Sequence, residues 1–285
     1  MPTRTPHATL AALPTPFTPA GDLDLDAAAR LVERIAASDA EGVFLAGTTG
    51  EFPALEPDER IRLLEIARRG LGDKRLVAHV GAASARQTIG LLTAAQELGV
   101  TEFAAITPYF LPVEESAILD YYAALGSHAA GGALYVYHFP DRTGAVVPPR
   151  LMAELARIPG IAGAKLSGLS WEEVAQYAAA VPAGFDVYTG NDADFPKAAG
   201  GAIRGVVSGV YAAFPETFDR LADDGASADR DRLLADLDHV VTALAGDIGR
   251  IKTVLEARAV CGPTTRMALP RPDAAALSAL ATDYR

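Results

Sequence analysis

The sequence predicts a (β/α)8 barrel with a C-terminal helical extension. Short apolar runs alternate along the chain with longer helical patterns, and eight such units fit into about 220 residues. Alternating strands and helices imply parallel strands joined by helical crossovers, and eight units match the (β/α)8 barrel. Further helical patterns follow the eighth unit, and we therefore expect an extension beyond the barrel.

The expected strands are short apolar runs, and the expected helices carry apolar residues at helical spacing. The strands are 10–13, 42–45, 76–80, 103–106, 133–137, 161–166, 185–188 and 205–207. The barrel helices are 26–37, 57–70, 85–98, 114–127, 148–157, 171–180, 194–199 and 215–223. Pro57, Asp58 and Glu59 together are typical of the first turn of a helix.

Three more helical patterns, at 229–244, 248–260 and 273–281, make up the expected extension. We therefore expect a barrel domain over residues 1–225 and a helical extension of the same domain over residues 226–285. A doubly wound parallel sheet is the rival fold. The barrel is favoured because no Gly-x-Gly-x-x-Gly pattern follows the first strand and no phosphate-loop pattern is present.

The composition narrows the range of partners. With a net charge of −11, the chain is a poor candidate for binding nucleic acid or an anionic membrane. No apolar stretch reaches the ~18 residues that a membrane-spanning helix needs. Cys261 is the only cysteine and the N-terminal residues lack the apolar core of a signal peptide, so we expect a cytoplasmic protein.

Lys165 is the strongest candidate for a catalytic residue. Of the four lysines, only this one lies within an apolar run, at 161–166, which we expect to be a strand buried on both faces. Desolvation lowers the pKa of a lysine, and a neutral amine is a nucleophile that forms a Schiff base with a ketone. The alternative is a strand-end lysine whose amine extends to water.

Other strand ends carry polar or conformationally special residues, at the face where barrel enzymes have their active sites. Thr48 and Thr49 lie between Gly47 and Gly50 and can offer hydroxyl and backbone N–H groups to a carboxylate, although Thr-Thr-Gly is also ordinary in turns. Glycines at positions 190 and 209 allow a close backbone approach to a ligand, or only a turn.

The fifth strand ends with further candidates. Tyr135 and Tyr137 share one face of this strand because side chains alternate. A tyrosine on the inner face beside a lysine is a plausible proton shuttle, and the alternative is a core tyrosine with one satisfied hydroxyl. Arg142 follows a Pro-Asp turn and can bind a carboxylate through two hydrogen bonds, or it is a surface arginine.

Metal and serine-hydrolase chemistry find little support in the sequence. The five histidines show no His-x-x-x-His or clustered Cys/His spacing, and Gly-x-Ser-x-Gly is absent. The acidic residues 22, 24 and 26 lack the later glycine and glutamate of a calcium loop, and we expect them to form a solvated turn and a helix cap. We expect no metal and no cofactor.

An ordered set of motifs resembles the dihydrodipicolinate synthase/N-acetylneuraminate lyase family of class I, pyruvate-dependent aldolases. The motifs are Gly47-Thr48-Thr49-Gly50-Glu51, Thr107-Pro108-Tyr109, the segment 137–144, Gly163-Ala164-Lys165, Gly190-Asn191-Asp192 and Val207-Ser208-Gly209. The resemblance covers the chain from about Leu10 to its end. It implies a metal-free lyase that binds pyruvate or another 2-oxo acid together with an aldehyde, and a homo-oligomer, either a dimer or a tetramer.

The resemblance also implies roles for individual residues. Lys165 would form the Schiff base, and Tyr137 would relay protons at the reacting carbons. Thr48 would hydrogen-bond to Tyr137, and Thr49 would hold the substrate carboxylate. The remaining expected substrate-binding residues are Arg142, Gly190, Val207 and Tyr109.

Several positions differ from the synthases of this family. Phe110 stands where a second tyrosine completes a proton relay in a neighbouring subunit, so that Tyr109 or water would have to replace it. Arg60, Ala83 and Gln87 stand at positions of the synthases' lysine feedback site. Arg142 agrees with the synthases, which use an arginine there for the second carboxylate.

These agreements and differences rank the possible activities. We expect an aldolase acting on a 2-oxo-3-deoxy or 4-hydroxy-2-oxo acid, because residues 50–53 are similar to the hydroxy-oxoglutarate and sugar-acid branches. A synthase that condenses pyruvate with aspartate semialdehyde is second, and a decarboxylating dehydratase is third. A non-catalytic protein that binds 2-oxo acids is the alternative of another class.

Overall fold

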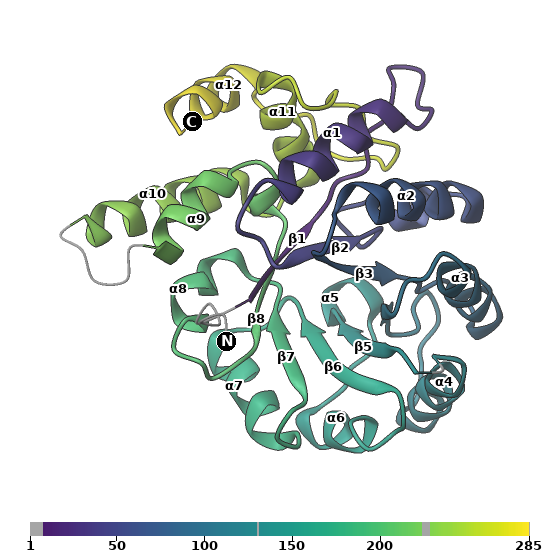
Figure 1. Ribbon diagram of the computed structural model, residues 1–285. Helices are drawn as coiled ribbons and strands as arrows, with labels where there is room; N and C mark the ends of the chain where they lie inside the picture. Colours follow the sequence, from purple (N-terminus) through teal and green to yellow (C-terminus); the bar gives the residue numbers. More distant parts are fainter. Residues whose placement is uncertain (1–7, 130, 224–228, 285) are drawn as a thin grey trace. The chain divides into compact units, whose positions relative to one another are not determined.

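The eight strands form a closed barrel in the order β1 to β8, which confirms the predicted fold (Figure 1). The computed structural model describes residues 8–129, 131–223 and 229–284. The strands are β1 (Ala8–Ala12), β2 (Gly42–Leu45), β3 (Arg75–His79), β4 (Glu102–Ile106), β5 (Ala133–His138), β6 (Ile161–Leu166), β7 (Asp186–Thr189) and β8 (Gly205–Ser208).

The predicted helices are present, and their observed ends differ from the expected ones by at most a few residues. They are α1 (Leu25–Ala36), α2 (Pro57–Gly70), α3 (Ala85–Glu97), α4 (Glu115–His128), α6 (Pro149–Leu155), α7 (Trp171–Ala180), α8 (Phe195–Ala198), α9 (Pro215–Asp223), α10 (Arg230–Leu244), α11 (Ile248–Ala257) and α12 (Ala274–Asp283). Elements not predicted from the sequence are α5 (Pro140–Thr143) and the 3-10 turns η1 (Phe52–Ala54), η2 (Asp192–Asp194) and η3 (Val210–Ala212). These elements are too short for a periodic pattern to reveal them.

The described chain divides into two compact units. The first unit comprises residues 9–75, 208–223 and 229–284, and the second comprises residue 8, 76–129 and 131–207. The predicted domain boundary at residues 225 and 226 lies outside the described residues. None of the helices in the described ranges has the length and apolar character needed to span a membrane.

The helices of the first unit begin where the sequence provides caps. Asp24 accepts a hydrogen bond from the backbone N–H of Ala27 at 2.9 Å, so the acidic residues near the N-terminus do cap α1. Helix α2 begins with Pro57 and has a capping box between Glu56 and Glu59. These caps use backbone N–H groups that have no partner within the helix.

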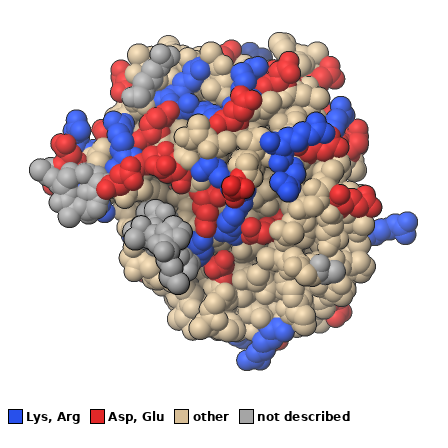
Figure 2. Space-filling model, in the orientation of Figure 1, with Lys and Arg blue, Asp and Glu red and all other residues tan. Residues whose placement is uncertain are grey.

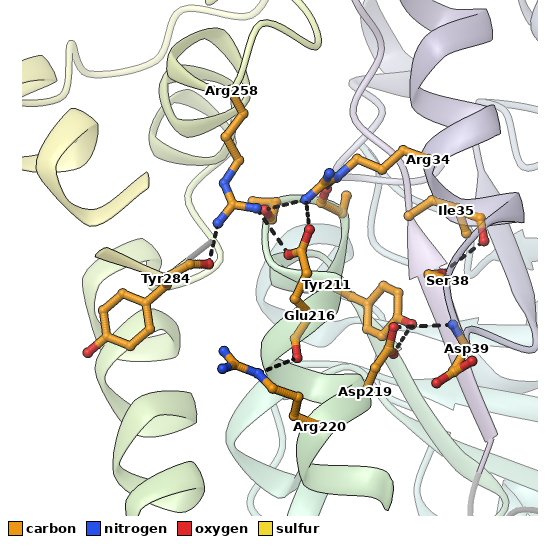
Figure 3. A network of polar contacts seen from close by, with 12 residues as sticks. Arg34, Ile35, Ser38, Asp39, Tyr211, Glu216, Asp219, Arg220, Arg258 and Tyr284 are labelled. Carbon is orange, nitrogen blue, oxygen red and sulfur yellow. Dashed lines mark hydrogen bonds and ion pairs between the residues drawn. The ribbon is translucent and has the colours of Figure 1, made fainter. Parts of the chain in front are cut away.

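A network of charged side chains joins α9 to α1 and α11 in the first unit (Figure 3). The carboxylate of Glu216 accepts hydrogen bonds from Arg34 at 2.7 Å and from Arg258 at 3.0 Å. Arg258 also donates to the backbone carbonyl of Tyr284 at 2.6 Å. One carboxylate near the start of α9 therefore holds arginines from two other segments of this unit.

Charges of both signs are mixed on one face of the molecule (Figure 2). On the face that Figure 2 shows, acidic and basic side chains lie close to one another, and wide areas carry neither. Mixed charge of this kind provides short-range ion pairs but no broad positive field for a polyanion.

His138 is a buried histidine at the end of β5, where it packs beside helix α7. Its side chain is 1% exposed, and its ring centroid lies 6.0 Å from that of Tyr177. Its Nδ1 has no hydrogen-bond partner within the described part of the chain. Burial lowers the pKa of His138 from 6.5 to about 4, so the imidazole is neutral at pH 7.

This burial predicts acid sensitivity. The pKa of His138 is lower in the folded state than in the unfolded state, so between pH 6.5 and 4 the unfolded chain binds more protons. As the pH falls from 7 to about 4.5, His138 should lower the free energy of unfolding by roughly 2–3 kcal/mol. Urea unfolding of the wild type and of His138→Asn at both pH values measures this difference, with exposed His128→Asn as the control. Equal losses in all three proteins would contradict the prediction.

Candidate functional site

Lys165 and Tyr137 lie against each other in the second unit. Lys165, on β6, is 6% exposed, and Tyr137, on β5, is 1% exposed. The Lys165 Nζ atom lies 4.0 Å from the centroid of the Tyr137 ring. An amine at this distance interacts with the negative face of the aromatic ring, and the contact fixes the direction of the lysine side chain.

A register shift between β5 and β6 creates this pairing. Leu134 pairs with Ile161, but the next residue, Tyr135, pairs with Gly163, so β6 has one extra residue at this point. Beyond the shift, Tyr137 pairs with Lys165. Without it, Tyr137 would pair with Ala164. Bulges commonly redirect side chains beside active sites, and this one sets the lysine against the tyrosine.

Gly163 makes room for the shifted strand. A Cβ atom there would lie 2.4 Å from the carbonyl oxygen of Asp186 and 2.6 Å from the ring of Tyr135. Both distances are shorter than the contacts that Cβ atoms make in proteins, so a side chain at position 163 would push β6 away from its neighbours. Glycine is therefore required two residues before the lysine.

His79 and Tyr188 are neighbours of the pair. The ring of His79, at the end of β3, lies edge-on to Tyr137 with the centroids 5.7 Å apart. Its Nε2 accepts the backbone N–H of Ile106 at 3.2 Å, which leaves the proton of a neutral ring on Nδ1. Tyr188 pairs with Lys165 in the ladder between β6 and β7. Neither residue was predicted as part of the site, because the sequence of a single strand does not reveal which other strands it meets.

The segments that follow β4 and β5 are joined by hydroxyl groups. Thr107 Oγ1 donates to Thr143 Oγ1 at 3.0 Å, and Thr143 Oγ1 donates to the carbonyl of Phe139 at 3.1 Å. Arg142 is exposed, with its guanidinium 5.5 Å from the ring centroid of Phe139. Both segments thus have a fixed backbone, and the arginine head group is accessible at the surface.

Tyr109 and Phe110 differ sharply in exposure. Tyr109 is half-buried, whereas Phe110 is 91% exposed and has a left-handed backbone with φ of 80°. Leu111 beside it is 70% exposed. Two large apolar side chains thus lie on the surface immediately after β4.

The two remaining candidates of the second unit lie at strand ends. Gly190 follows β7, and a Cβ atom there would lie 2.1 Å from Ser167 Oγ, so a side chain at this position would require the Ser167 hydroxyl to move. Its backbone N–H donates to the carbonyl of Leu166 at 2.6 Å. Val207, on β8, is 2% exposed.

Thr48 and Thr49 belong to the first unit, where they lie half-buried in a turn after β2. The backbone N–H of Glu51 donates to the carbonyl of Thr48 at 2.9 Å and closes the turn. A Cβ atom on Gly209, which follows β8, would lie 3.4 Å from Thr49 Oγ1, so the threonine side chain covers this glycine. Hydroxyl and amide donors are thus gathered at one turn.

Lys252 is a second buried lysine, which was not predicted from the sequence. It lies on α11 with 0% exposure, and its Nζ is 2.6 Å from Glu51 Oε1. Burial lowers the pKa of Lys252, and the ion pair with Glu51 opposes this shift. On a helix, burial follows the packing of the whole element, so a lysine between Arg250 and Thr253 can still be enclosed.

No cluster of three His, Cys, Asp or Glu side chains suited to a metal ion occurs among residues 8–129, 131–223 and 229–284. The groups that the structure does provide are an amine beside a phenol in the second unit, and hydroxyl and amide donors in the first. Chemically these are a nucleophile, a group that can carry a proton, and a binding surface for a carboxylate.

The chain matches a known protein family over nearly its whole length. The model of the dihydrodipicolinate synthetase family matches residues 5–263. The chain is 33% identical over 225 residues to 4-hydroxy-tetrahydrodipicolinate synthase 1 of Streptomyces coelicolor, covering 78% of this chain and 72% of the relative. It is 31% identical over 267 residues to the corresponding synthase of Exiguobacterium sibiricum, covering 91% and 90%.

Solved structures show the same fold at lower identity. A catalytic lysine mutant of Ruminococcus gnavus sialic acid aldolase aligns with a TM-score of 0.89 at 20% identity, covering 99% of this chain and 97% of that one. YagE from Escherichia coli K12, solved in complex with pyruvate, aligns with a TM-score of 0.88 at 22% identity, covering 98% of both chains. The match of the family model over nearly the whole sequence shows that the chain belongs to the dihydrodipicolinate synthetase family of lyases.

Proposed function

We propose that this protein is a class I lyase that makes or cleaves a carbon–carbon bond of a 2-oxo acid through a Schiff base on Lys165. The observation that carries the proposal is the buried amine of Lys165, 4.0 Å from the ring of Tyr137 in a member of this family. A buried nucleophile beside a phenol is costly to build, and binding alone requires neither group. This argues against the non-catalytic alternative.

In the first step, the Lys165 amine attacks the keto carbon of pyruvate. The resulting carbinolamine loses its hydroxyl group as water, for which the phenol of Tyr137 supplies a proton. The product is a protonated imine between Nζ and C2. Because this imine withdraws electrons from the neighbouring carbon, a proton can leave C3 and an enamine forms.

The carbon–carbon step follows from the enamine. Its C3 attacks the carbonyl carbon of an aldehyde, the new bond forms, and the aldehyde oxygen takes up a proton. In the cleavage direction the same steps run in reverse, so that the aldehyde leaves and pyruvate is released after water hydrolyses the imine. Tyr137 relays the protons in both directions.

Thr48 and Thr49 are the proposed partners of the reactants in the first unit. Thr49 and its backbone N–H hold the carboxylate of the 2-oxo acid, and Thr48 orients the phenol of Tyr137. Gly190, Val207 and Tyr109 are proposed to line the substrate site, with Tyr109 or water replacing the relay hydroxyl that Phe110 lacks. The fixed backbone of the Thr48–Thr49 turn supports this role, since preorganised donors bind an anion with little reorganisation.

A 2-oxo-3-deoxy or 4-hydroxy-2-oxo acid is our preferred substrate. The absent hydroxyl at Phe110 supports this choice, because the synthases of the family complete their relay there. The second candidate is 4-hydroxy-tetrahydrodipicolinate synthase. It is supported by the names of the curated relatives and by the accessible guanidinium of Arg142, which can bind a second carboxylate.

We further propose a cytoplasmic homo-oligomer, either a dimer or a tetramer. The exposed apolar side chains of Phe110 and Leu111 support self-association, because large apolar groups at the surface gain free energy when a partner covers them.

Borohydride trapping tests the Schiff base. Reduction in the presence of pyruvate should fix a pyruvate adduct on Lys165, because borohydride reduces the imine to a stable secondary amine. Peptide mass mapping locates the adduct. Lys165→Ala should lose it, whereas Lys197→Ala, which removes a lysine from the surface, should retain it. Wild-type protein that stays unmodified at saturating pyruvate would exclude the proposed chemistry.

Tyr137→Phe separates proton transfer from imine formation. Removing only the hydroxyl should lower turnover by roughly 100-fold or more, as expected for the loss of a positioned acid–base group. The ring remains, so Lys165 should still be trapped at long reaction times. Steady-state assays beside trapping measure both quantities. Turnover close to that of the wild type would assign the proton relay to another group, with Tyr109 the first to be tested.

A substrate panel decides between the two branches. We expect pyruvate release from at least one 2-oxo-3-deoxy or 4-hydroxy-2-oxo acid, followed with a coupled lactate dehydrogenase assay. Condensation of pyruvate with aspartate semialdehyde is assayed in parallel, with Arg142→Ala as a variant that should impair only reactions with a second carboxylate. Activity confined to the condensation would overturn our preference.

A further inference from the structure

We propose that Glu51 is a positioning residue for the Thr48–Thr49 turn, and that the segment from α11 to Met267 sets the affinity for the 2-oxo acid by holding Glu51. This inference rests on the proposed function of the turn and extends it to a part of the chain to which that function assigns no contact with substrate. All the residues involved belong to the first unit.

The carboxylate of Glu51 is completely buried, and both of its oxygens accept hydrogen bonds. Its side chain and that of Lys252 are both 0% exposed, and Lys252 Nζ lies 2.6 Å from Glu51 Oε1. The other oxygen, Oε2, accepts the backbone N–H groups of Arg266 at 2.9 Å and Met267 at 2.8 Å. One buried carboxylate therefore binds three donors, all of them C-terminal to residue 250.

The donors are themselves fixed. Lys252 Nζ also donates to the carbonyl of Thr264 at 2.7 Å, and it lies 4.4 Å from the ring centroid of Phe17. Arg266 donates to both carboxylate oxygens of Glu59, at 2.5 and 2.7 Å, and to the carbonyl of Ala54 at 2.9 Å. Glu51 is thus paired with Lys252 and Glu59 with Arg266, so that each charge has a partner of opposite sign.

The backbone of Glu51 transmits this anchoring to the threonines. Its φ of 56° is left-handed, a conformation that a residue with a Cβ atom adopts only when its surroundings enforce it. In this conformation its N–H reaches the carbonyl of Thr48. Thr15 Oγ1 donates to the carbonyl of Gly50 at 2.7 Å and holds the turn from the other side. Loss of the carboxylate contacts would therefore release the turn at Glu51.

Three variants test the proposal. Glu51→Gln keeps the size of the side chain and removes its charge. Lys252→Met leaves a buried carboxylate without its ammonium partner, and the double variant Glu51→Gln/Lys252→Met removes both charges together. The matched control is Arg258→Met. Arg258 lies at the end of the same helix as Lys252, but its guanidinium binds Glu216 and not Glu51 (Figure 3).

The first readout is the pyruvate concentration at which half of Lys165 is trapped by borohydride. We expect it to rise by about tenfold or more in the Glu51 and Lys252 variants, which corresponds to about 1.4 kcal/mol of binding free energy. The half-saturating concentration of hydroxyacetone, a ketone without a carboxylate, should change by less than about twofold, since among the groups of the substrate the turn is proposed to hold only the carboxylate. Arg258→Met should leave both values near those of the wild type.

The second readout is amide hydrogen exchange of the peptide that contains residues 47–52, measured without ligand. Exchange there should be faster in the Glu51 and Lys252 variants and unchanged in Arg258→Met. This readout does not depend on the reaction. If wild-type protein traps no pyruvate, the proposed function fails, and the exchange data still decide whether Glu51 holds the turn.

Two results would overturn the inference. One is a folded Glu51→Gln protein with wild-type exchange in the turn and a wild-type pyruvate dependence. The other is an equal rise in the half-saturating pyruvate concentration for Arg258→Met, which would assign the effect to a general loss of stability. If Lys252→Met does not fold, Glu51→Gln and the double variant decide the question, because neither leaves an unpaired carboxylate at this position.

Discussion

Two lysine amines are withdrawn from water in this protein, and the free-energy cost of burying an amine explains much of what surrounds them. Removing an ammonium group from water costs several kcal/mol unless a partner compensates. At Lys252 the compensation is complete, with Glu51 and a backbone carbonyl in direct contact. At Lys165 the Nζ atom lies over the face of the Tyr137 ring. The arrangement at Lys252 suits a fixed structural charge, whereas Lys165 is the amine that we propose reacts.

Small departures from regular strand geometry position the amine of Lys165. A single extra residue in β6 changes the partner of Tyr137 from Ala164 to Lys165. Gly163 permits the shift, since any side chain there would strike Asp186 and Tyr135. The packing of the strands therefore explains the sequence Gly163-Ala164-Lys165. The glycine lets the strands approach, and the lysine two residues later points to the same face.

The C-terminal helices take part in more than the stability of the barrel. Within the first unit they carry Lys252, and the segment after α11 supplies the two N–H groups that bind Glu51. A second set of contacts, centred on Glu216, joins the same helix to α1 and α9 (Figure 3). The two sets of contacts use similar chemistry, but only the first reaches the Thr48–Thr49 turn. The contacts of Glu216 therefore connect helices, whereas those of Glu51 are the ones that we propose position the turn.

The sequence by itself determined the eight strands, nearly all the helices and the burial of Lys165, because these features depend on local periodicity and on short apolar runs. The ordered motifs also pointed to the family that the comparisons show. Only the tertiary structure decided which side chains meet. Glu51 and Lys252 are 201 positions apart, and His79 reaches Tyr137 from another strand. Such pairs follow from the closure of the fold and from a one-residue register shift, neither of which leaves a periodic signal in the sequence.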